Sequence, residues 1–279
     1  MESPARQVFS APPSWAGLAA RWHAVATPLR PSAEDAAYTQ RVIDALVRRT
    51  SAPRVLLLGV TPELSSLRYP AEARLIAVDS SVEMLSALWK PPSGCASLAL
   101  HARWETLPVA PGSLDLVLAD ASVCALPDVR TIHAVLAMVA CAMRPGAWLC
   151  GRTFVSPPQP ECIDVILREL REGRAGSVHG TKWRIAMALQ GLSENGVALA
   201  DVWRVFQRAG DRELLGVRHG WSAASVATLD AYRDVSSRLC FPTFARTREL
   251  FAAHFDELDC RLPDYELGER CPTLLLRRR

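Results

Sequence analysis

The sequence lacks the features that mark a membrane or nucleic-acid-binding protein. No apolar run among its 279 residues approaches the ~20 needed to span a bilayer. The first fifteen residues lack the basic-then-apolar order of a secretory signal. The net charge is only +3, with acidic and basic residues mixed along the chain, so we expect no basic face for nucleic acid. We therefore expect a cytoplasmic protein without nucleic-acid or membrane partners, and leave a homodimer open.

The sequence also lacks cysteine and histidine clusters. Its eight cysteines form no C-x-x-C pair and no zinc-type spacing, so no metal site is predicted. Cys260 and Cys271 flank an expected hairpin and are conceivable disulfide partners, although reduced thiols are favoured in a cytosol.

Glycine is scarce where a nucleotide loop would need it. The stretch VLLLGVTPEL (55–64) joins an apolar strand to an expected helix with Gly59 alone. This disfavours a dinucleotide site, whose glycines let the backbone approach a pyrophosphate, and no Walker-type motif follows. Thr61 as N-cap, Pro62 at the first helical position and Glu63 in the first turn predict a helix start, whose free N–H groups attract a carboxylate.

Alternating strands and helices predict a doubly wound α/β fold with a mostly parallel sheet. Strands are expected at 54–60, 75–78, 98–100, 114–119 and 147–155, and helices at 33–47 after the N-cap Ser32, at 81–89 and at 128–143. A helix at 244–254 and antiparallel strands at 257–262 and 271–276 are expected to complete the chain.

Three parts are predicted. Residues 1–32 form an irregular N-terminal arm, residues 33–156 and 241–279 form the α/β domain, and residues 157–240 form a helical insert. Within the insert we expect helices at 161–171, 181–190, 199–208 and 223–239, and an extended piece at 213–217.

Four stretches together resemble class I S-adenosylmethionine-dependent methyltransferases. They are VLLLGVTPEL, LIAVDSSVEML (75–85), ARWETLPVAPGSLDLVLAD (102–120) and the final strand pair. The resemblance covers about 40–155 and 243–279, and implies a Rossmann-like seven-stranded sheet with an antiparallel C-terminal strand. It implies S-adenosylmethionine as cofactor, S-adenosylhomocysteine as product, and methyl transfer to a small-molecule acceptor, with a role in secondary metabolism and with the insert as acceptor pocket or lid.

The resemblance also implies roles for individual residues. Gly59, Val60 and Thr61 would face the methionine part, Asp79 the ribose, Ser80, Met84, Trp104 and Glu105 the adenine, and Asp120 the sulfonium. Arg30 lies in the arm, outside the resemblance; if the arm folds over the cofactor, its guanidinium could bind the methionine carboxylate in a bidentate way. Four positions depart from the family pattern. Leu57 replaces the acid that orients the amino group, Thr61 and Glu63 stand in the places of the second and third glycines, and Arg103 replaces the acid of the adenine loop.

The catalytic chemistry stays open at this point. Displacement from a sulfonium depends on positioning, and a base is needed only if the acceptor must lose a proton. Candidates for such a base are His133, His179 and Tyr232. The main alternative is a non-catalytic binding or scaffold protein on the same fold, and an NAD-dependent oxidoreductase ranks third because the glycines are missing.

Overall fold

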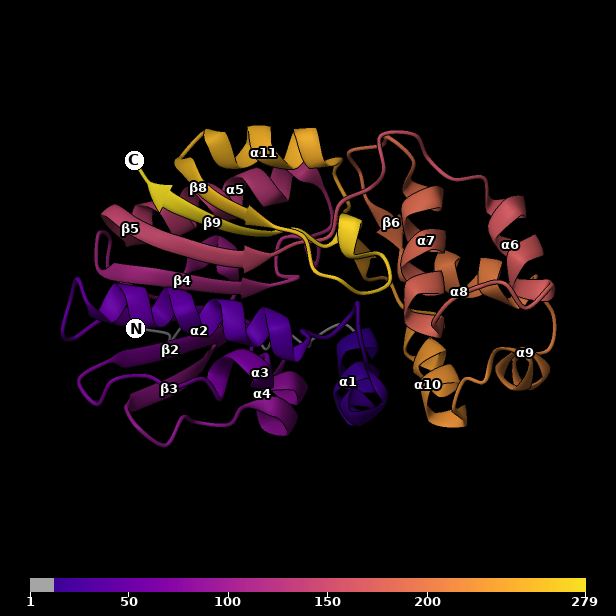
Figure 1. Cartoon of the computed structure of the whole chain (residues 1–279), viewed down its shortest axis with the longest axis horizontal. Coiled ribbons are helices and arrows are strands. Elements are labelled where there is room, and N and C mark those ends of the chain that lie inside the picture. The colour runs from indigo at the N-terminus through magenta and orange to yellow at the C-terminus, as the bar shows by residue number, and fades with distance from the viewer. Residues whose placement is uncertain (1–12) are drawn as a thin grey trace, which may run out of the picture.

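The computed structural model describes residues 13–279. Its centre is a seven-stranded sheet in the order β3-β2-β1-β4-β5-β9-β8 (Figure 1). The strands are β1 (Arg54–Leu58), β2 (Arg74–Asp79), β3 (Ala96–His101), β4 (Leu114–Asp120), β5 (Met143–Arg152), β8 (Phe255–Arg261) and β9 (Thr273–Arg278). The first five are parallel, and β9 runs antiparallel to both β5 and β8. The predicted fold class, including the antiparallel ending, is confirmed.

The central strands are mostly apolar because helices cover both faces of the sheet. In β1, Leu56 and Leu58 face one core cluster while Val55 and Leu57 face the other, as the two-residue period of a strand requires. The first cluster is closed by α5 (Val129–Ala142) and α11 (Phe244–Ala252), and the second by α2 (Ala33–Val47), α3 (Pro62–Ser65) and α4 (Val82–Leu88).

The insert is helical, with two departures from the prediction. It contains α6 (Ile163–Arg171), α7 (Val178–Gln190), α8 (Leu199–Gln207), α9 (Arg212–His219), α10 (Ala223–Ala227), the 3₁₀ helix η3 (Thr228–Tyr232), and a small antiparallel pair of β6 (Val197–Ala198) with β7 (Arg238–Leu239). The extended piece at 213–217 is wrong, because Asp211 caps a helix there and Gly220 ends it in the left-handed conformation. The helix expected to 239 ends at Tyr232, and Asp234 has a positive φ of 54°.

The arm also differs from the irregular segment that we expected. Pro13–Ala20 form α1 and Trp22–Ala24 form the 3₁₀ helix η1, whereas residues 1–12 lie outside the described part. Helix α1 contacts both α4 of the sheet domain and η3 of the insert, and Figure 1 shows it between the two. At this crossing a side chain on Gly17 would come within 3.2 Å of Ala231 Cβ. The division into arm, domain and insert stays a prediction.

Two further observations concern the cysteines and the lengths of the helices. Cys260 and Cys271 are both free thiols. Among residues 13–279, no helix is long and apolar enough to cross a membrane.

The predicted N-cap of α2 is confirmed in detail. Ser32 Oγ accepts a hydrogen bond from Asp35 N at 3.1 Å, and Asp35 Oδ2 accepts one from Ser32 N at 2.9 Å, which is a complete capping box. The cap fixes the point at which the arm enters the helix that covers the sheet.

Ser32→Ala is therefore expected to lower the free energy of unfolding by about 1 kcal/mol, the usual cost of a lost N-cap. Urea denaturation followed by circular dichroism measures this change. Ser66→Ala, at an exposed serine after α3, is the control. Equal stability of the two variants would contradict the capping role.

Candidate cofactor and acceptor site

A cavity of about 390 Å³ opens at the carboxyl ends of β1, β2 and β4, the edge where doubly wound sheets bind ligands. Nine of the ten predicted cofactor residues line it, and only Arg30 does not: Gly59, Val60, Thr61, Asp79, Ser80, Met84, Trp104, Glu105 and Asp120. Its volume falls in the ordinary range of small-molecule pockets. The fold thus brings together residues that are up to 61 positions apart, from Gly59 to Asp120.

Asp79 ends β2 and faces Gly59 across the cavity wall. Its Oδ1 accepts a hydrogen bond from Ser81 N at 2.8 Å. Burial raises the pKa of Asp79 to about 6, against the opposing effects of the Ser81 backbone and His101. A Cβ on Gly59 would lie 3.7 Å from Asp79 Oδ2, and Gly59 has a φ of 95° that disfavours any side chain. Gly59 is thus required by the turn itself.

Trp104 and Glu105 form the next part of the wall. Trp104 Nε1 donates to the carbonyl of Val78 at 2.7 Å, which ties the indole to the end of β2. Glu105 is hydrogen-bonded by Arg103. Burial acts to raise the pKa of Glu105, but this contact outweighs it and the pKa is lowered. Arg103 and Glu105 are therefore coupled, and Glu105 is held as a carboxylate.

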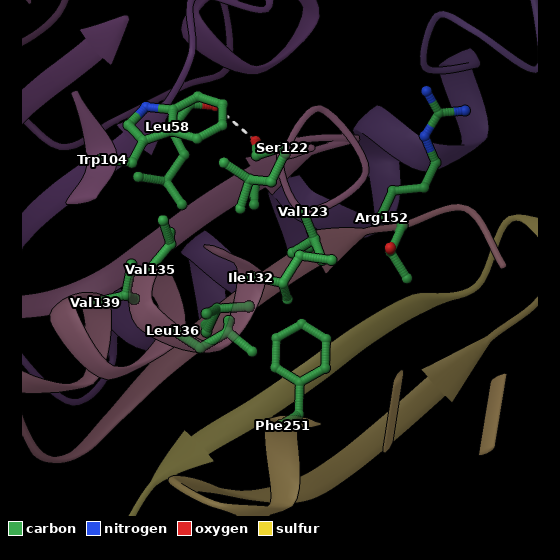
Figure 2. Close-up of a pocket in the computed structure, with 15 residues that line it drawn as sticks. Leu58, Trp104, Ser122, Val123, Ile132, Val135, Leu136, Val139, Arg152 and Phe251 are labelled. Carbon is green, nitrogen blue, oxygen red and sulfur yellow. Dashed lines mark hydrogen bonds between the residues drawn. The ribbon is translucent and has the colours of Figure 1, made fainter. Parts of the chain in front are cut away.

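Beneath this wall the interior is closely packed (Figure 2). The remaining hollow, between Trp104, Leu58 and the apolar face of α5, has a volume of about 10 Å³, too small for more than one water molecule. Ser122 Oγ donates to the carbonyl of Leu58 at 2.9 Å and closes its upper edge. The floor of the site is thus part of the core and holds the wall residues in place.

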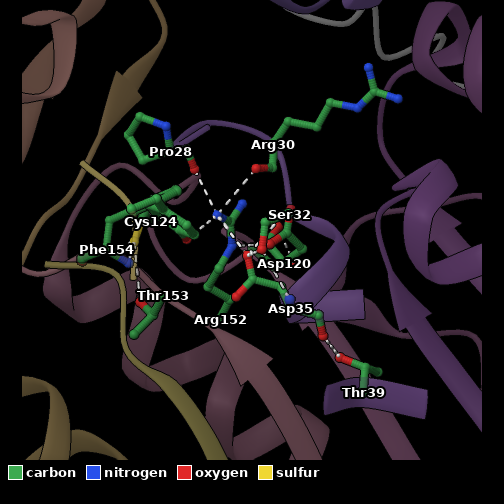
Figure 3. A network of polar contacts seen from close by, with 12 residues as sticks. Pro28, Arg30, Ser32, Asp35, Thr39, Asp120, Cys124, Arg152, Thr153 and Phe154 are labelled. Carbon is green, nitrogen blue, oxygen red and sulfur yellow. Dashed lines mark hydrogen bonds and ion pairs between the residues drawn. The ribbon is translucent and has the colours of Figure 1, made fainter. Parts of the chain in front are cut away.

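The sequence reasoning missed Arg152, the most connected side chain near the site. Arg152 lies at the end of β5, is 4% exposed, and is paired in register with Asp120 on β4. Its Nε donates to Asp120 Oδ1 at 2.7 Å, and Asp35 lies 3.8 Å from Nη1 (Figure 3). Nη1 also donates to the Pro28 carbonyl at 2.7 Å and to the Tyr265 hydroxyl at 2.8 Å. An arginine within an otherwise apolar strand was the signal that could have revealed it.

The network changes the setting of Asp120. Burial acts to lower the pKa of Arg152, but the Asp120 carboxylate and its other neighbours outweigh it and raise the pKa. The guanidinium is therefore permanently charged and compensates Asp120. Asp120 reaches the cavity as one member of an ion pair, not as the free carboxylate expected beside a sulfonium.

Glu63 and Arg30 form a second pair, at the turn after β1. Arg30 Nε donates to Glu63 Oε1, while Glu63 Oε2 is buried without a hydrogen-bond partner among residues 13–279. Burial raises the pKa of Asp120, Arg152 opposes this, and the nearby charges of Asp35 and Glu63 add to the rise. Glu63 thus lies close enough to Asp120 to act on it.

The start of α3 differs from the expected anion site. The helix has four residues, and the Thr61 side chain makes no capping hydrogen bond. Leu57 is fully buried in the core below α2. Neither residue supplies the carboxylate that the family pattern places on β1. Glu63, in the first turn of α3, is an acid whose buried Oε2 has no partner among residues 13–279.

The far half of the cavity is apolar and comes from the arm, the insert and the segment after β4. Its walls include Trp15, Leu18, Trp22, Val25 and Leu29 of the arm, Trp183, Leu199, Tyr232 and Leu239 of the insert, and Cys124, Ala125, Leu126 and Pro127. Of the three candidate bases, only Tyr232 lines the cavity. His179 is buried with Nε2 on the Ala24 carbonyl at 3.0 Å, and His133 lies beside His254 with ring centroids 6.1 Å apart.

Comparisons with known proteins support the fold and leave the activity open. No family model matches the sequence, and no curated protein matches it. Solved structures similar to the chain are mostly S-adenosylmethionine-dependent methyltransferases of low identity. One similar structure is a putative zinc-dependent alcohol dehydrogenase from Rhodobacter sphaeroides, with 14% identity over 94% of this chain and 98% of that chain and a TM-score of 0.53. A methyltransferase from Methanosarcina mazei has 12% identity over 81% of this chain and 92% of that chain and a TM-score of 0.46. The N-methyltransferase NodS from Bradyrhizobium japonicum, in complex with S-adenosylhomocysteine, has 8% identity over 94% of this chain and 98% of that chain and a TM-score of 0.47.

The sheet order, with five parallel strands followed by the antiparallel pair β9 and β8, is that of the Rossmann-like methyltransferase fold. At identities this low the likeness concerns the fold alone. Within residues 13–279, no group of three or more His, Cys, Asp or Glu side chains is arranged to hold a metal ion.

The residues present fit an adenosine that carries a zwitterionic amino acid. Asp79 offers a carboxylate for hydroxyl groups, and Trp104 offers a fixed aromatic ring beside Glu105. Buried polar atoms without partners in the described chain include an acceptor, Glu63 Oε2, and a donor, Arg152 Nη2. An ammonium and a carboxylate would satisfy one each.

The buried ion pair predicts a large effect on stability. Arg152→Met leaves Asp120 and Asp35 buried without their cation, and is expected to lower the free energy of unfolding by about 3–5 kcal/mol. Denaturant titration measures the loss, and the double variant Asp120→Asn with Arg152→Met is expected to regain part of it. Arg204→Met, which breaks an exposed pair with Asp201, is the control and should cost less than about 1 kcal/mol. A similar cost at both arginines would contradict the network's role.

Proposed function

We propose that the protein transfers a methyl group from S-adenosylmethionine to a small-molecule acceptor. The observation that carries this proposal is one cavity that runs from Asp79 and Trp104, at the sheet edge, to Tyr232 and Trp183 in the insert. Its two ends have different chemistry, polar on the nucleotide side and aromatic on the other. We propose a cytoplasmic reaction without nucleic-acid or membrane partners, and a role in secondary metabolism on the family resemblance alone.

In this proposal the chain's own residues bind, orient and exclude water. Asp79 accepts hydrogen bonds from the ribose hydroxyls, and Trp104 and Met84 pack on the adenine, whose amino group is within the reach of Glu105. The bound cofactor supplies an already activated methyl group, so positioning and a dry acceptor half provide most of the rate. The apolar side chains of the arm and insert exclude water from the line of transfer.

The amino-acid end of the cofactor is the part where this chain departs from its family. We assign the ammonium to Glu63, whose Oε2 has no partner among residues 13–279, and the carboxylate to Arg30, which now pairs with Oε1 of the same glutamate. Neither residue lines the cavity, so the assignment requires both side chains to turn toward it when the cofactor binds. The ammonium and the carboxylate of the cofactor would each pair with one member of this ion pair, so that no charge would be left without a counter-charge. Leu57 then needs no replacement on β1 itself.

Calorimetric titration with S-adenosylhomocysteine tests the proposal. The Asp79 carboxylate must be ionised to accept hydrogen bonds from both ribose hydroxyl groups. Burial raises its pKa in the free protein to about 6. Affinity is therefore expected to be constant above that pH and to fall by about tenfold per pH unit below it. Asp79→Ala is expected to abolish binding, and Asp79→Asn to bind weakly without this pH dependence.

Three outcomes separate the competing functions. Binding of S-adenosylhomocysteine and not of NAD supports the methyltransferase. Binding of neither favours a scaffold protein on the same fold, and binding of NAD alone favours an oxidoreductase. Wild-type affinity in Asp79→Ala would reject the ribose assignment.

A second titration isolates the role of Glu63. Glu63→Gln removes a charge-assisted hydrogen bond to the ammonium, worth about 1.5–3 kcal/mol, so S-adenosylhomocysteine should bind about 10–100-fold more weakly. Methylthioadenosine, which lacks the amino-acid end, should bind the variant and the wild type equally. Glu34→Gln is the matched control, because Glu34 is an exposed glutamate that pairs with Arg261 and does not line the cavity. Equal losses for both ligands would reject the assignment.

A further inference from the structure

Lys182 is a buried cation without a counter-ion. It lies on α7, is 0% exposed, and its Nζ donates to Thr228 Oγ1 at 2.8 Å. No carboxylate in residues 13–279 forms an ion pair with it, and Asp230, the acid on the neighbouring η3, pairs with Arg212 at 2.7 Å. Burial alone lowers the pKa of Lys182 to about 7. Buried lysines are normally paired, because an unpaired charge in a protein interior is costly.

The choice of lysine at this position is itself unusual for this chain. Only two of its 32 basic residues are lysines, Lys182 and the exposed Lys90. Arginine stays charged at any ordinary pH, whereas a buried lysine can lose or regain its proton near neutrality. The one buried lysine is therefore a group whose charge can change near neutral pH, which an arginine at the same position could not do.

Lys182 lies directly behind the acceptor half of the cavity. Its Nζ is 5.1 Å from the ring centroid of Tyr232, which lines that half, and the adjacent residue Trp183 lines it as well. Tyr232 is 3% exposed and lines the cavity, and no hydrogen bond of its hydroxyl is found within the described chain. The hydroxyl is thus a polar group offered to a ligand in an otherwise apolar space.

The cations behind the aromatic walls also favour an anionic ligand. Aromatic side chains often bind cations over their faces, but here the chain supplies its own. Arg30 lies over Trp22 at 5.9 Å and Lys182 over Tyr232 at 5.1 Å. Because Arg30 is already paired with Glu63, a cationic ligand would meet the uncompensated charge of Lys182, whereas an anion would supply the counter-charge that Lys182 lacks.

We propose that the acceptor is a flat aromatic compound with an acidic hydroxyl group, bound as its anion between the tryptophans, with Tyr232 contacting the oxygen and Lys182 supplying the positive charge. This inference rests on the proposed function, since it names the acceptor of that reaction. An oxygen that is already ionised needs no further base before transfer, so none of His133, His179 and Tyr232 has to act as one.

Three probes with the same nitrophenyl ring test this assignment on the full chain. They are 4-nitrophenol, the neutral 4-nitroanisole, and the cation trimethyl(4-nitrophenyl)ammonium. Fluorescence quenching of the cavity tryptophans gives the affinities, and the absorbance of 4-nitrophenol reports whether it is bound as phenol or phenolate. We expect phenolate absorbance at a pH where the free compound is mostly protonated, at least a tenfold preference for 4-nitrophenol over 4-nitroanisole, and no binding of the cation.

Lys182→Met is expected to abolish the phenolate signal and the preference while 4-nitroanisole still binds. Lys90→Met is the matched control, and Tyr232→Phe should weaken 4-nitrophenol alone. If Lys182→Met does not fold, the wild-type absorbance shift and Tyr232→Phe still decide the matter. Equal affinity for the three probes, or binding of 4-nitrophenol in its neutral form, would overturn the assignment. Titration with S-adenosylhomocysteine remains a separate measurement, so its failure would reject the function and not the anion site.

Discussion

The ion pair between Arg152 and Asp120 is the interaction on which the site depends. It joins the carboxyl ends of β4 and β5, where each of the two charged side chains would otherwise be buried without a counter-charge. The same guanidinium reaches Asp35 in the first turn of α2 and the carbonyl of Pro28 in the arm. One buried cation therefore sets the relative positions of the sheet edge, a covering helix and the arm.

The charges around the cavity differ between its two regions. At the sheet edge, carboxylates and guanidinium groups compensate each other, as Arg152 does for Asp120 and Arg30 for Glu63. In the insert, Lys182 has no such partner among the residues that the structure describes. In the proposed reaction the cofactor is zwitterionic at the sheet edge and the acceptor is negative beside Lys182, which is a stricter requirement than the shape of the cavity alone.

The parts of this picture that follow a local periodicity were predictable from the sequence. The five parallel strands, the capping box at Ser32 and the strand-end position of Asp79 all depend on residues close to one another in the chain. The extended piece assigned to 213–217 was wrong because Leu214 and Val217, 69% and 83% exposed, are apolar residues on the surface of a capped helix. Arg152 and Lys182 were missed because their importance comes from partners, or the lack of them, that only tertiary packing decides.

The arm that walls the acceptor half is held at two points. The Pro28 carbonyl accepts from Arg152 at 2.7 Å, and the Ala24 carbonyl accepts from His179 at 3.0 Å. Between these two anchors lies only Val25–Thr27, and beyond them Trp15, Leu18 and Trp22 cover the cavity. If a ligand leaves past these residues, at least one anchor must break, and residence time in the cavity is then set by local opening of the arm. The lifetime of a complex and the strength of its contacts would then be governed by different residues, and a slow release step would follow from the fold itself.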